Sequence, residues 1–577
     1  MPLRPTVHHA KAGQYARPGG PWDVPTLDEA LDGETVRVVD GDRRLGGRAL
    51  SEAIDDVVDW LRELGGAPGD VISWQLPNGL ETYLLYRACW RVGAVAAAVH
   101  RSAGPADVAA ALGQAHPRIV ISDPTLPAAA WVGAITLTPG DTHWPPAAPR
   151  LAPLAPPRPE DLAAVMFTSG SSGQPKAVMH THRALVCKAR GMIAVHQLTP
   201  DDVVLMPAPL AHVSGLQNGV FVPGAAGMGT VLMAKWDPEA AIGLIERERV
   251  TFMVGPPTFF VAMMEAPGFS IERVASLRLV SSGGSGVTPA FVESASAALG
   301  ARVKRTYGST EAPTTTTSGP DDPPERDRST DGQAMGETEL RITEPASGDE
   351  LAAGTVGELW VRGPEVFVGY LDQAATDAAF APGGWYRTGD LGFVDGDGWL
   401  TITGRRKDII IRGGENISAA EIEAVLEAHP SIAQAAAVGY PDDRMGQRVC
   451  AYVVASEPFD LAACQRWMEE RGVTRFKWPE RVEQVDALPL LAAGKVDRAA
   501  LERAASTAKV WCSDAAKRVM ASGLQVHGGI GFTWEHDLHL FLKRSQLDQM
   551  SYGDAGLHRE RLAQILRPRA ESGLPVL

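Results

Sequence analysis

Residues 163–176 read AAVMFTSGSSGQPK, an apolar run that passes directly into a loop rich in glycine and hydroxyl side chains. The apolar run has the length and composition of a buried β-strand. The loop from Thr168 to Lys176 contains two glycines, four hydroxyls and one lysine, and such a set of N–H, O–H and cationic donors suits a polyphosphate. It is not a Walker A loop, because Ala177 follows Lys176 where that motif needs Ser or Thr. Taken alone, the loop is equally compatible with an exposed Ser/Gly turn.

Similar apolar runs recur along the first 400 residues and alternate with longer helical segments. The runs are DVISWQL (70–76), RIVIS (118–122) and LRLVSS (277–282), and one of the helical segments is ALSEAIDDVVDWLREL (49–64). This alternation predicts an α/β protein with substantially parallel sheets. The Pro-rich stretch 144–161 is expected to cross between elements, and the polar stretch 314–332 is expected to form an exposed loop.

After about Thr403 the pattern changes to that of a small α+β unit. DIIIR (408–412), AQAAAVG (433–439) and VCAYVVA (449–455) have the composition of strands, and helices are predicted at 418–430 and near 460–471. Ser418 and Glu421 form a capping-box pattern at the start of the first helix.

The overall composition limits the function classes that remain. A length of 577 residues predicts more than one domain, and a net charge of −15 argues against nucleic-acid or anionic-membrane binding. There is no apolar run of the ~18 residues that span a bilayer, and the N-terminus lacks the apolar core of a secretory signal. Five cysteines without a CxxC pair suggest neither a disulfide framework nor a zinc site. We therefore expect a cytoplasmic protein.

Four more motifs carry chemistry-bearing side chains. In YGSTE (307–311) an aromatic face suits a base and a carboxylate suits Mg²⁺, and in GWYRTGD (384–390) the aspartate suits ribose hydroxyls. GRRKDIIIRGGENISAAEIE (404–423) and AAGKVDRAAL (492–501) add cations and glycines. Each motif alone is also compatible with a turn, a hairpin or a solvated charged face. His180 and His182 have no convincing third ligand, so we interpret them as surface or capping histidines.

The five motifs, in this order, resemble the ANL superfamily of adenylate-forming enzymes, which comprises acyl-CoA synthetases, peptide-synthetase adenylation domains and luciferases. The segment that begins with DVISWQLPN further resembles cyclohexanecarboxylate and medium-chain acyl-CoA ligases. The resemblance implies that a carboxylate attacks MgATP to give acyl-AMP and pyrophosphate, and that the thiol of CoA then displaces AMP. It implies ATP, Mg²⁺ and CoA as cofactors, and a small C-terminal domain that is mobile about a hinge at Lys407.

The resemblance also implies a role for each motif residue. Those that would hold the ATP phosphates are Thr168, Ser169, Gly170, Ser171, Ser172, Gly173 and Lys176. Tyr307 would flank adenine, Thr310 would touch the α-phosphate and Glu311 would bind Mg²⁺. Asp390 and Arg405 would bind ribose, and Lys495 would bridge the carboxylate and the α-phosphate. Gly413 and Gly414 would line the CoA tunnel. His212 would lie near the acyl pocket, and a hydrogen-bonded core histidine is an equal interpretation.

Two positions depart from the family pattern. The family commonly has Gly where this chain has Ala177, and a basic or Thr-bearing segment where this chain has Leu490 and Leu491. The acid itself is not readable from the sequence, although 207–218 and 283–286 are expected to shape its pocket. Alicyclic, aromatic and medium-chain acids all stay open, as does a homo-oligomer.

We predict an ATP- and acyl-binding domain at 1–403, a small domain at 404–503 and a helical tail at 504–577. QVHGGIGFT (525–533) in the tail resembles the last helices of acyl-CoA dehydrogenases, but no counterpart of a complete flavin site is present. The tail is either a fusion remnant or a module that docks on the ligase or on a dehydrogenase partner. The predicted function is a carboxylate:CoA ligase. Its alternatives are an acyl-AMP ligase that loads a carrier protein and a pseudoenzyme scaffold, whereas the absence of GxSxG disfavours a hydrolase.

Overall fold

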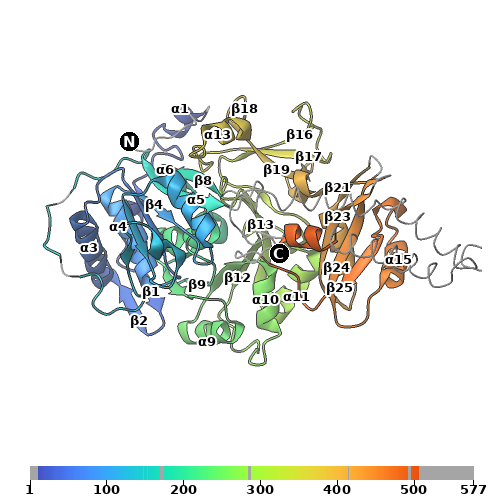
Figure 1. Cartoon of the computed structure of the whole chain (residues 1–577), viewed down its shortest axis with the longest axis horizontal. Coiled ribbons are helices and arrows are strands. Elements are labelled where there is room, and N and C mark those ends of the chain that lie inside the picture. The colour runs from blue at the N-terminus through green and yellow to red at the C-terminus, as the bar shows by residue number, and fades with distance from the viewer. Residues whose placement is uncertain are drawn as a thin grey trace, which may run out of the picture. The chain divides into compact units, whose positions relative to one another are not determined.

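The computed structural model describes residues 9, 11–146, 148–152, 154–168, 175–283, 287–412, 415–442, 445–490 and 496–505. Contacts divide these residues into two compact units (Figure 1). The first contains residues up to Thr388 together with Gly392–Ile402, and the second contains Gly389–Leu391 and the described residues from Thr403 on. No helix in these ranges is long and apolar enough to cross a membrane.

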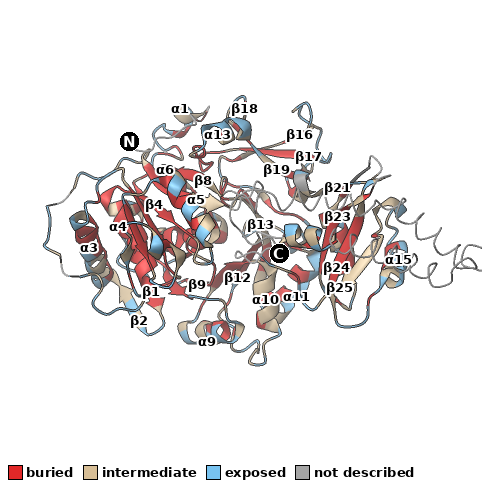
Figure 2. Cartoon of the chain, in the orientation of Figure 1, coloured by how far each residue is buried: buried red, intermediate tan, exposed pale blue. Residues whose placement is uncertain are grey.

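The first unit contains a six-stranded sheet built around buried apolar strands. Its order is β6-β5-β3-β4-β7-β8, parallel except for the antiparallel pair β7 and β8. The strands are β3 (Val71–Gln75), β4 (Val95–Ala98), β5 (Ile119–Ser122), β6 (Ile135–Thr136), β7 (Leu162–Thr168) and β8 (Lys176–Thr181). Every residue of β3, β4 and β5 is buried, as the red strands in Figure 2 show for β4. The predicted α/β fold with parallel-rich sheets is confirmed.

A second sheet of the first unit has nine strands. Its order is β15-β14-β13-β12-β11-β9-β10-β1-β2, and the pairs from β1 to β13 along this order are parallel. Its strands are β1 (Arg37–Asp40), β2 (Arg43–Gly46), β9 (Val203–Met206), β10 (Gly229–Leu232), β11 (Phe252–Gly255), β12 (Leu279–Gly283), β13 (Arg302–Tyr307), β14 (Thr316–Thr317) and β15 (Gln333–Ala334).

Helices of the first unit pack around these two sheets and, in the case of α13, against a third sheet. They are α1 (Ala12–Tyr15), α2 (Leu27–Ala30), α3 (Gly47–Glu63), α4 (Leu80–Val92), α5 (Pro105–Ala115), α6 (His182–His196), α7 (Val213–Leu216), α8 (Val222–Ala226), α9 (Pro238–Glu248), α10 (Pro257–Met264), α11 (Pro289–Leu299), α12 (Pro324–Ser329) and α13 (Gln373–Ala379). A π-helical turn, η2 (Gln217–Phe221), joins α7 to α8, and a 3₁₀ turn, η1 (Pro127–Ala130), follows β5. Among its described residues, the Pro-rich stretch 144–161 contains no helix or strand, as predicted.

The prediction of an exposed loop at 314–332 is wrong at both ends of the stretch, whereas its middle, 320–325, is mostly exposed. Thr316 and Thr317 form β14, which pairs with β13 and β15, and both side chains are buried. Their hydroxyls have partners inside the protein, since Thr316 Oγ1 donates to the carbonyl of Asp331 at 2.6 Å. Polar side chains satisfied in this way give a buried segment the composition of a loop.

A third sheet follows in the chain. It has the order β16-β17-β19-β18, with β20 paired to β19. Its strands are β16 (Glu339–Thr343), β17 (Gly357–Arg362), β18 (Phe380–Ala381), β19 (Trp385–Val394) and β20 (Leu400–Arg405). The last two strands contribute residues to both units.

The second unit is the predicted α+β arrangement. A five-stranded sheet, β22-β21-β24-β23 with β25 paired to β24, packs against α14, whose Ile422 and Leu426 are buried. Ser418 Oγ accepts from the N–H of Glu421 at 3.4 Å, which is one half of the predicted capping box, whereas Glu421 Oε1 accepts from Lys477 Nζ at 2.6 Å. The elements are η3 (Arg406–Asp408), β21 (Ile409–Arg412), β22 (Glu415–Ser418), α14 (Ala419–Glu427), β23 (Ile432–Asp442), β24 (Gly446–Ala455), α15 (Leu461–Glu470), η4 (Arg475–Lys477) and β25 (Arg481–Gln484).

Candidate active site

Lys176 of the phosphate loop and Glu311, the predicted metal ligand, both contact the side chain of Tyr370. Thr168 and Lys176 are paired across the antiparallel strands β7 and β8. Lys176 Nζ lies 4.9 Å from the centroid of the Tyr370 ring, and the Tyr370 hydroxyl donates to Glu311 Oε1 at 2.7 Å. Two residues that the sequence motifs single out separately are therefore brought together by a third that sequence reasoning missed.

The loop 307–314, which carries Tyr307, Thr310 and Glu311, closes on itself. Ser309 N–H donates to the carbonyl of Ala312 at 3.0 Å, and Ala312 N–H donates to Ser309 Oγ at 3.1 Å. A Cβ on Gly308 would lie 2.3 Å from the backbone nitrogen of Thr314, so this close approach requires glycine.

The base of this loop is held by buried polar side chains. Thr314 has φ +39°, a left-handed conformation that is rare for a β-branched residue. Its carbonyl accepts from Lys188 Nζ at 2.8 Å, and its hydroxyl accepts from Gln217 Nε2 at 2.8 Å. Lys188 is 2% exposed and lies 3.6 Å from Glu365 Oε1. These contacts fix the backbone from which Thr310 and Glu311 project.

His180 forms a hydrogen bond to the backbone of the same loop. It is fully buried, and its Nε2 lies 2.8 Å from the carbonyl of Thr310, so Nε2 carries the proton and donates. Burial lowers the pKa of His180 to about 4 and keeps the ring neutral. His182 is buried as well, with its pKa lowered to about 4 by burial, and it accepts from the N–H of Leu27 at the start of α2. The prediction that these are surface histidines is wrong, whereas the capping interpretation holds for His182.

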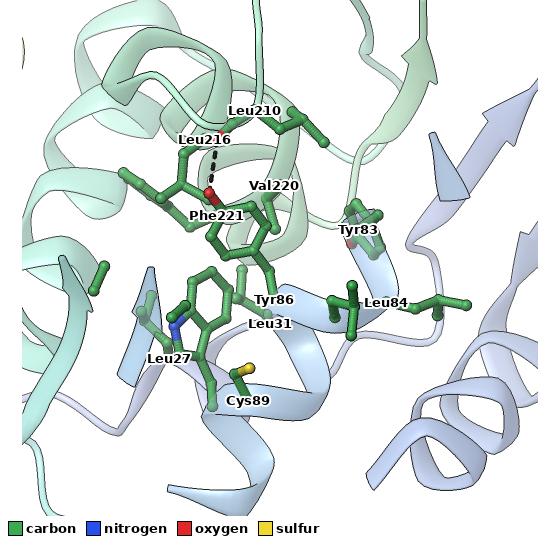
Figure 3. Close-up of a cluster of buried hydrophobic side chains, with 14 of the residues drawn as sticks. Leu27, Leu31, Tyr83, Leu84, Tyr86, Cys89, Leu210, Leu216, Val220 and Phe221 are labelled. Atoms are coloured by element: carbon green, nitrogen blue, oxygen red, sulfur yellow. Dashed lines mark hydrogen bonds between the residues drawn. The ribbon is translucent and has the colours of Figure 1, made fainter. Parts of the chain in front are cut away.

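The segment before His212 is fixed from α4 and from the loop that precedes it. Asn78 donates to the carbonyl of Ala208 and accepts from the N–H of Leu210, both at 2.8 Å. Tyr86 donates to the carbonyl of Leu210 at 2.8 Å, and Figure 3 shows this bond above an apolar cluster. His212 itself is half-buried at the N-cap of α7. The structure therefore gives the predicted acyl-pocket segment a rigid backbone.

The two predicted ribose ligands form an ion pair. Arg405 Nε lies 2.8 Å from Asp390 Oδ1, and the exposed fractions of the two side chains are 45% and 5%. Such a pair can form charge-assisted hydrogen bonds with two neighbouring hydroxyls, because the carboxylate accepts and the guanidinium donates. Lys407 lies in η3, two residues after Arg405.

Several predicted site residues lie outside the described residues. They are Ser169, Gly170, Ser171, Ser172, Gly173, Gly413, Gly414 and Lys495. Strands β21 and β22 on either side of the two glycines are antiparallel, with Arg412 opposite Glu415.

The described part of the site offers a cation, a carboxylate and a closed loop of donors next to one another. Mg²⁺ is usually held in proteins by one or two carboxylates together with substrate phosphates. Glu311 fits this role, because Tyr370 occupies Oε1 and no described residue forms a hydrogen bond with Oε2. The arrangement suits the binding of a metal-bound polyphosphate.

Comparisons with known proteins agree with this chemistry. Residues 29–371 match the family model described as AMP-binding enzyme, 421–495 match AMP-binding enzyme C-terminal domain, and 477–566 match acyl-CoA dehydrogenase, C-terminal domain.

Curated relatives and solved structures cover most of the chain. A medium-chain fatty-acid–CoA ligase of Escherichia coli (strain K12) is 33% identical over 79% of this chain and 85% of its own length. Enterobactin synthase component E of the same organism is 32% identical over 85% of this chain and 96% of its own. The ATP-bound crystal structure of MatB from Rhodopseudomonas palustris is 29% identical, with a TM-score of 0.77 over 83% of this chain and 98% of that one.

Proposed function

This chain belongs to the AMP-binding enzyme family, and we propose that it is an ATP-dependent carboxylate:CoA ligase that acts through an acyl-AMP intermediate. A carboxylate oxygen attacks the α-phosphorus of ATP and pyrophosphate leaves. The thiol of CoA then attacks the acyl carbonyl, and AMP leaves with the carboxylate oxygen. ATP and CoA are the co-substrates, and Mg²⁺ accompanies ATP.

The observation that carries the proposal is the cluster of Lys176, Tyr370 and Glu311. The cation of Lys176 suits the β- and γ-phosphates, and Glu311 suits the metal ion that neutralises them. Negative charge grows on the α-phosphoryl oxygens during adenylation, so a fixed cation there lowers the barrier. We assign that role to Lys495, in accordance with its motif. Thr310 would contact the same phosphoryl group, and its backbone is held by His180.

The remaining nucleotide contacts are assigned on the same basis. Tyr307, at the end of β13, would flank the adenine. Within their ion pair, Asp390 would accept hydrogen bonds from the ribose hydroxyls and Arg405 would donate hydrogen bonds to them. In the second half-reaction Gly413 and Gly414 would line the path of the CoA thiol, after rotation of the small domain about Lys407.

A second candidate acceptor is the thiol of a carrier protein. The similarity to enterobactin synthase component E, which spans 96% of that relative, is the observation that favours it. Both candidates share the adenylation half-reaction and differ only in the thiol that displaces AMP.

The test is pyrophosphate release from ATP with a panel of cyclohexanecarboxylic, benzoic and octanoic acids, each with and without CoA. A CoA ligase turns over repeatedly only with CoA and forms the CoA ester. Acid-dependent pyrophosphate release that CoA leaves unchanged, without a CoA ester, favours the carrier-loading alternative. No acid-dependent release with any acid would favour the pseudoenzyme scaffold.

For the tail after about residue 504 we propose no flavin chemistry. The match to the dehydrogenase domain begins at 477, within a stretch where the structure places β25 in the sheet of the second unit. The first residues of that match therefore belong to the sheet of the second unit. We propose that the tail docks on an acyl-CoA dehydrogenase, because such a partner would consume the acyl-CoA product.

A further inference from the structure

We propose that Tyr370 is a positioning residue that holds the phosphate-binding lysine and the metal-binding carboxylate in register, with its ring under Lys176 and its hydroxyl on Glu311. The proposal rests on the proposed function, because it concerns how Mg²⁺ and the phosphates of ATP are aligned. Tyr370 is far along the chain from both partners and belongs to none of the five motifs.

The backbone of Tyr370 is anchored to both partners' segments. Val178 and Tyr370 form an antiparallel bridge, and the carbonyl of Ala177 accepts from the N–H of Leu371 at 3.0 Å, so this segment runs beside the start of β8. The N–H of Phe367 donates to the carbonyl of Glu311 at 2.8 Å. One short segment is therefore bonded through its main chain to the residues that follow Lys176 and to Glu311, before the tyrosine side chain contributes.

The hydroxyl selects one oxygen of the carboxylate. It donates to Oε1 of Glu311 at 2.7 Å, which restricts the rotation of the carboxylate and leaves Oε2 without a hydrogen bond among the described residues.

The ring is itself immobilised. Tyr370 is 3% exposed, and its ring packs edge-on against Phe367 at 4.8 Å between centroids. Lys176 Nζ lies 4.9 Å from the centroid of the same ring, within the range of a cation–π contact. A rigid ring limits the positions that the flexible lysine side chain adopts, so the cation is held on the same scaffold as the carboxylate.

The two contacts are separable by substitution. Tyr370→Phe removes the hydroxyl and keeps the ring, so the Mg²⁺ concentration that half-saturates adenylation should rise about tenfold, as expected for the loss of a hydrogen bond to a charged group. KM for ATP at saturating Mg²⁺ should stay near the parent value. Tyr370→Leu also removes the ring, and KM for ATP should then rise about three- to tenfold as well.

The matched control is Tyr83→Phe. Tyr83 is fully buried, and its hydroxyl has no hydrogen-bond partner among the described residues, so Mg²⁺ dependence should not change. Calorimetric titration of ATP at several Mg²⁺ concentrations gives the same comparison without turnover. It also separates a failed positioning role from a failed reaction, because it needs no carboxylic acid.

A double variant distinguishes positioning from a general structural role. In a Glu311→Gln background, the further change Tyr370→Phe should leave the Mg²⁺ dependence of ATP binding as Glu311→Gln alone has it. Parent-like Mg²⁺ dependence in Tyr370→Phe would overturn the proposal. So would a parallel fall in melting temperature, ATP affinity and Mg²⁺ affinity, because that result would make Tyr370 structural only.

Discussion

Lys188 is a buried cation at the base of the loop that carries Glu311. Its Nζ donates to the carbonyl of Thr314 and lies 3.6 Å from Glu365 Oε1. Glu365 is also buried and accepts a hydrogen bond from the hydroxyl of Thr338. Lys188 and Glu365 are thus buried together, and either charge without the other would be poorly solvated.

We predict that Lys188→Met destabilises the protein by about 3–5 kcal/mol, because Glu365 is left buried and unpaired. Urea unfolding at neutral pH measures the change. The double variant Lys188→Met with Glu365→Gln removes both charges and should recover a large part of the loss. A single variant as stable as the parent would show that the pair contributes nothing.

His196, the last residue of α6, is a buried histidine without a hydrogen-bond partner on either ring nitrogen within the described ranges. Burial, with the nearby cations Lys304 and Arg278 adding to it, holds its pKa well below the ordinary value. The unfolded chain therefore binds a proton near pH 6.5 that the folded chain refuses, so stability falls as pH falls below about 6.5.

We predict that His196→Met reduces this acid sensitivity. Between pH 7 and pH 5, one histidine kept neutral costs the parent about 2 kcal/mol of unfolding free energy, and the variant should lose that much less. Urea unfolding at both values of pH measures the difference. Identical pH dependence in parent and variant would show that His196 titrates normally.

The sequence offers the motif residues as candidates because each lies in a compact run of characteristic residue types. The role of Tyr370 could not be predicted in this way, because it depends on contacts with Glu311, 59 residues away, and with Lys176, which is still farther away along the chain. Burial of His180 and His182 was missed for a related reason. Only the fold shows that the carbonyl of Thr310 and the N–H of Leu27 are their partners.

At the scale of elements, apolar runs predicted strands reliably. DVISWQL, RIVIS and LRLVSS correspond to β3, β5 and β12, because a strand buried on both faces needs an almost continuous apolar sequence. The run 314–332 misled because its threonines are buried with hydroxyl partners, and composition cannot distinguish such partners from water.

The short turn η3, which contains Lys407, connects β20 to β21. The family resemblance implies that the hinge lies here. We predict that Lys407→Pro keeps acyl-AMP formation and loses CoA-ester formation, because proline fixes φ near −65°. Separate assays of the two half-reactions measure this.

Lys407→Ala is the control for the loss of the side chain and should keep both half-reactions. Equal loss of both in the proline variant would point to misfolding or to a hinge elsewhere. The contact division between the units falls at Ile402 and Thr403, so a proline variant at Thr403 is the next position to compare.

At the scale of the whole molecule, the ligase fold reaches slightly beyond the boundary predicted at 503. Residues 498–505 are helical, and Leu501 and Ala505 are buried in a cluster with Tyr452. The Tyr452 hydroxyl donates to the carbonyl of Leu501 at 3.2 Å. A truncation that keeps this helix therefore tests the tail more cleanly than one within it.

We predict that a chain ending at Ser506 folds, binds ATP and keeps its ligase rate, because it retains Leu501 and Ala505, which are buried against Tyr452 in the second unit. Melting temperature and CoA-ester formation are compared with those of the full chain. The full chain should show no flavin absorbance. A truncation that abolishes folding, or a flavin band, would give the tail a role that the ligase account lacks.

The family and the α/β architecture were predictable because five motifs recur in order, and matches to AMP-binding enzymes confirm this recognition. The acid was not, because its pocket is assembled from side chains that only the fold brings together. The contacts of Asn78 and Tyr86 on the segment before His212 show how distant residues shape that region.

The most direct test of the central claim follows one oxygen atom. A carboxylic acid from the active panel, labelled with ¹⁸O in both carboxylate oxygens, is converted with ATP and CoA, and the nucleotide product is analysed by mass spectrometry. The acyl-AMP route predicts AMP that carries one ¹⁸O for each CoA ester formed, because the attacking carboxylate oxygen leaves with the phosphoryl group. Unlabelled AMP, or ADP and phosphate in place of AMP and pyrophosphate, would contradict the account.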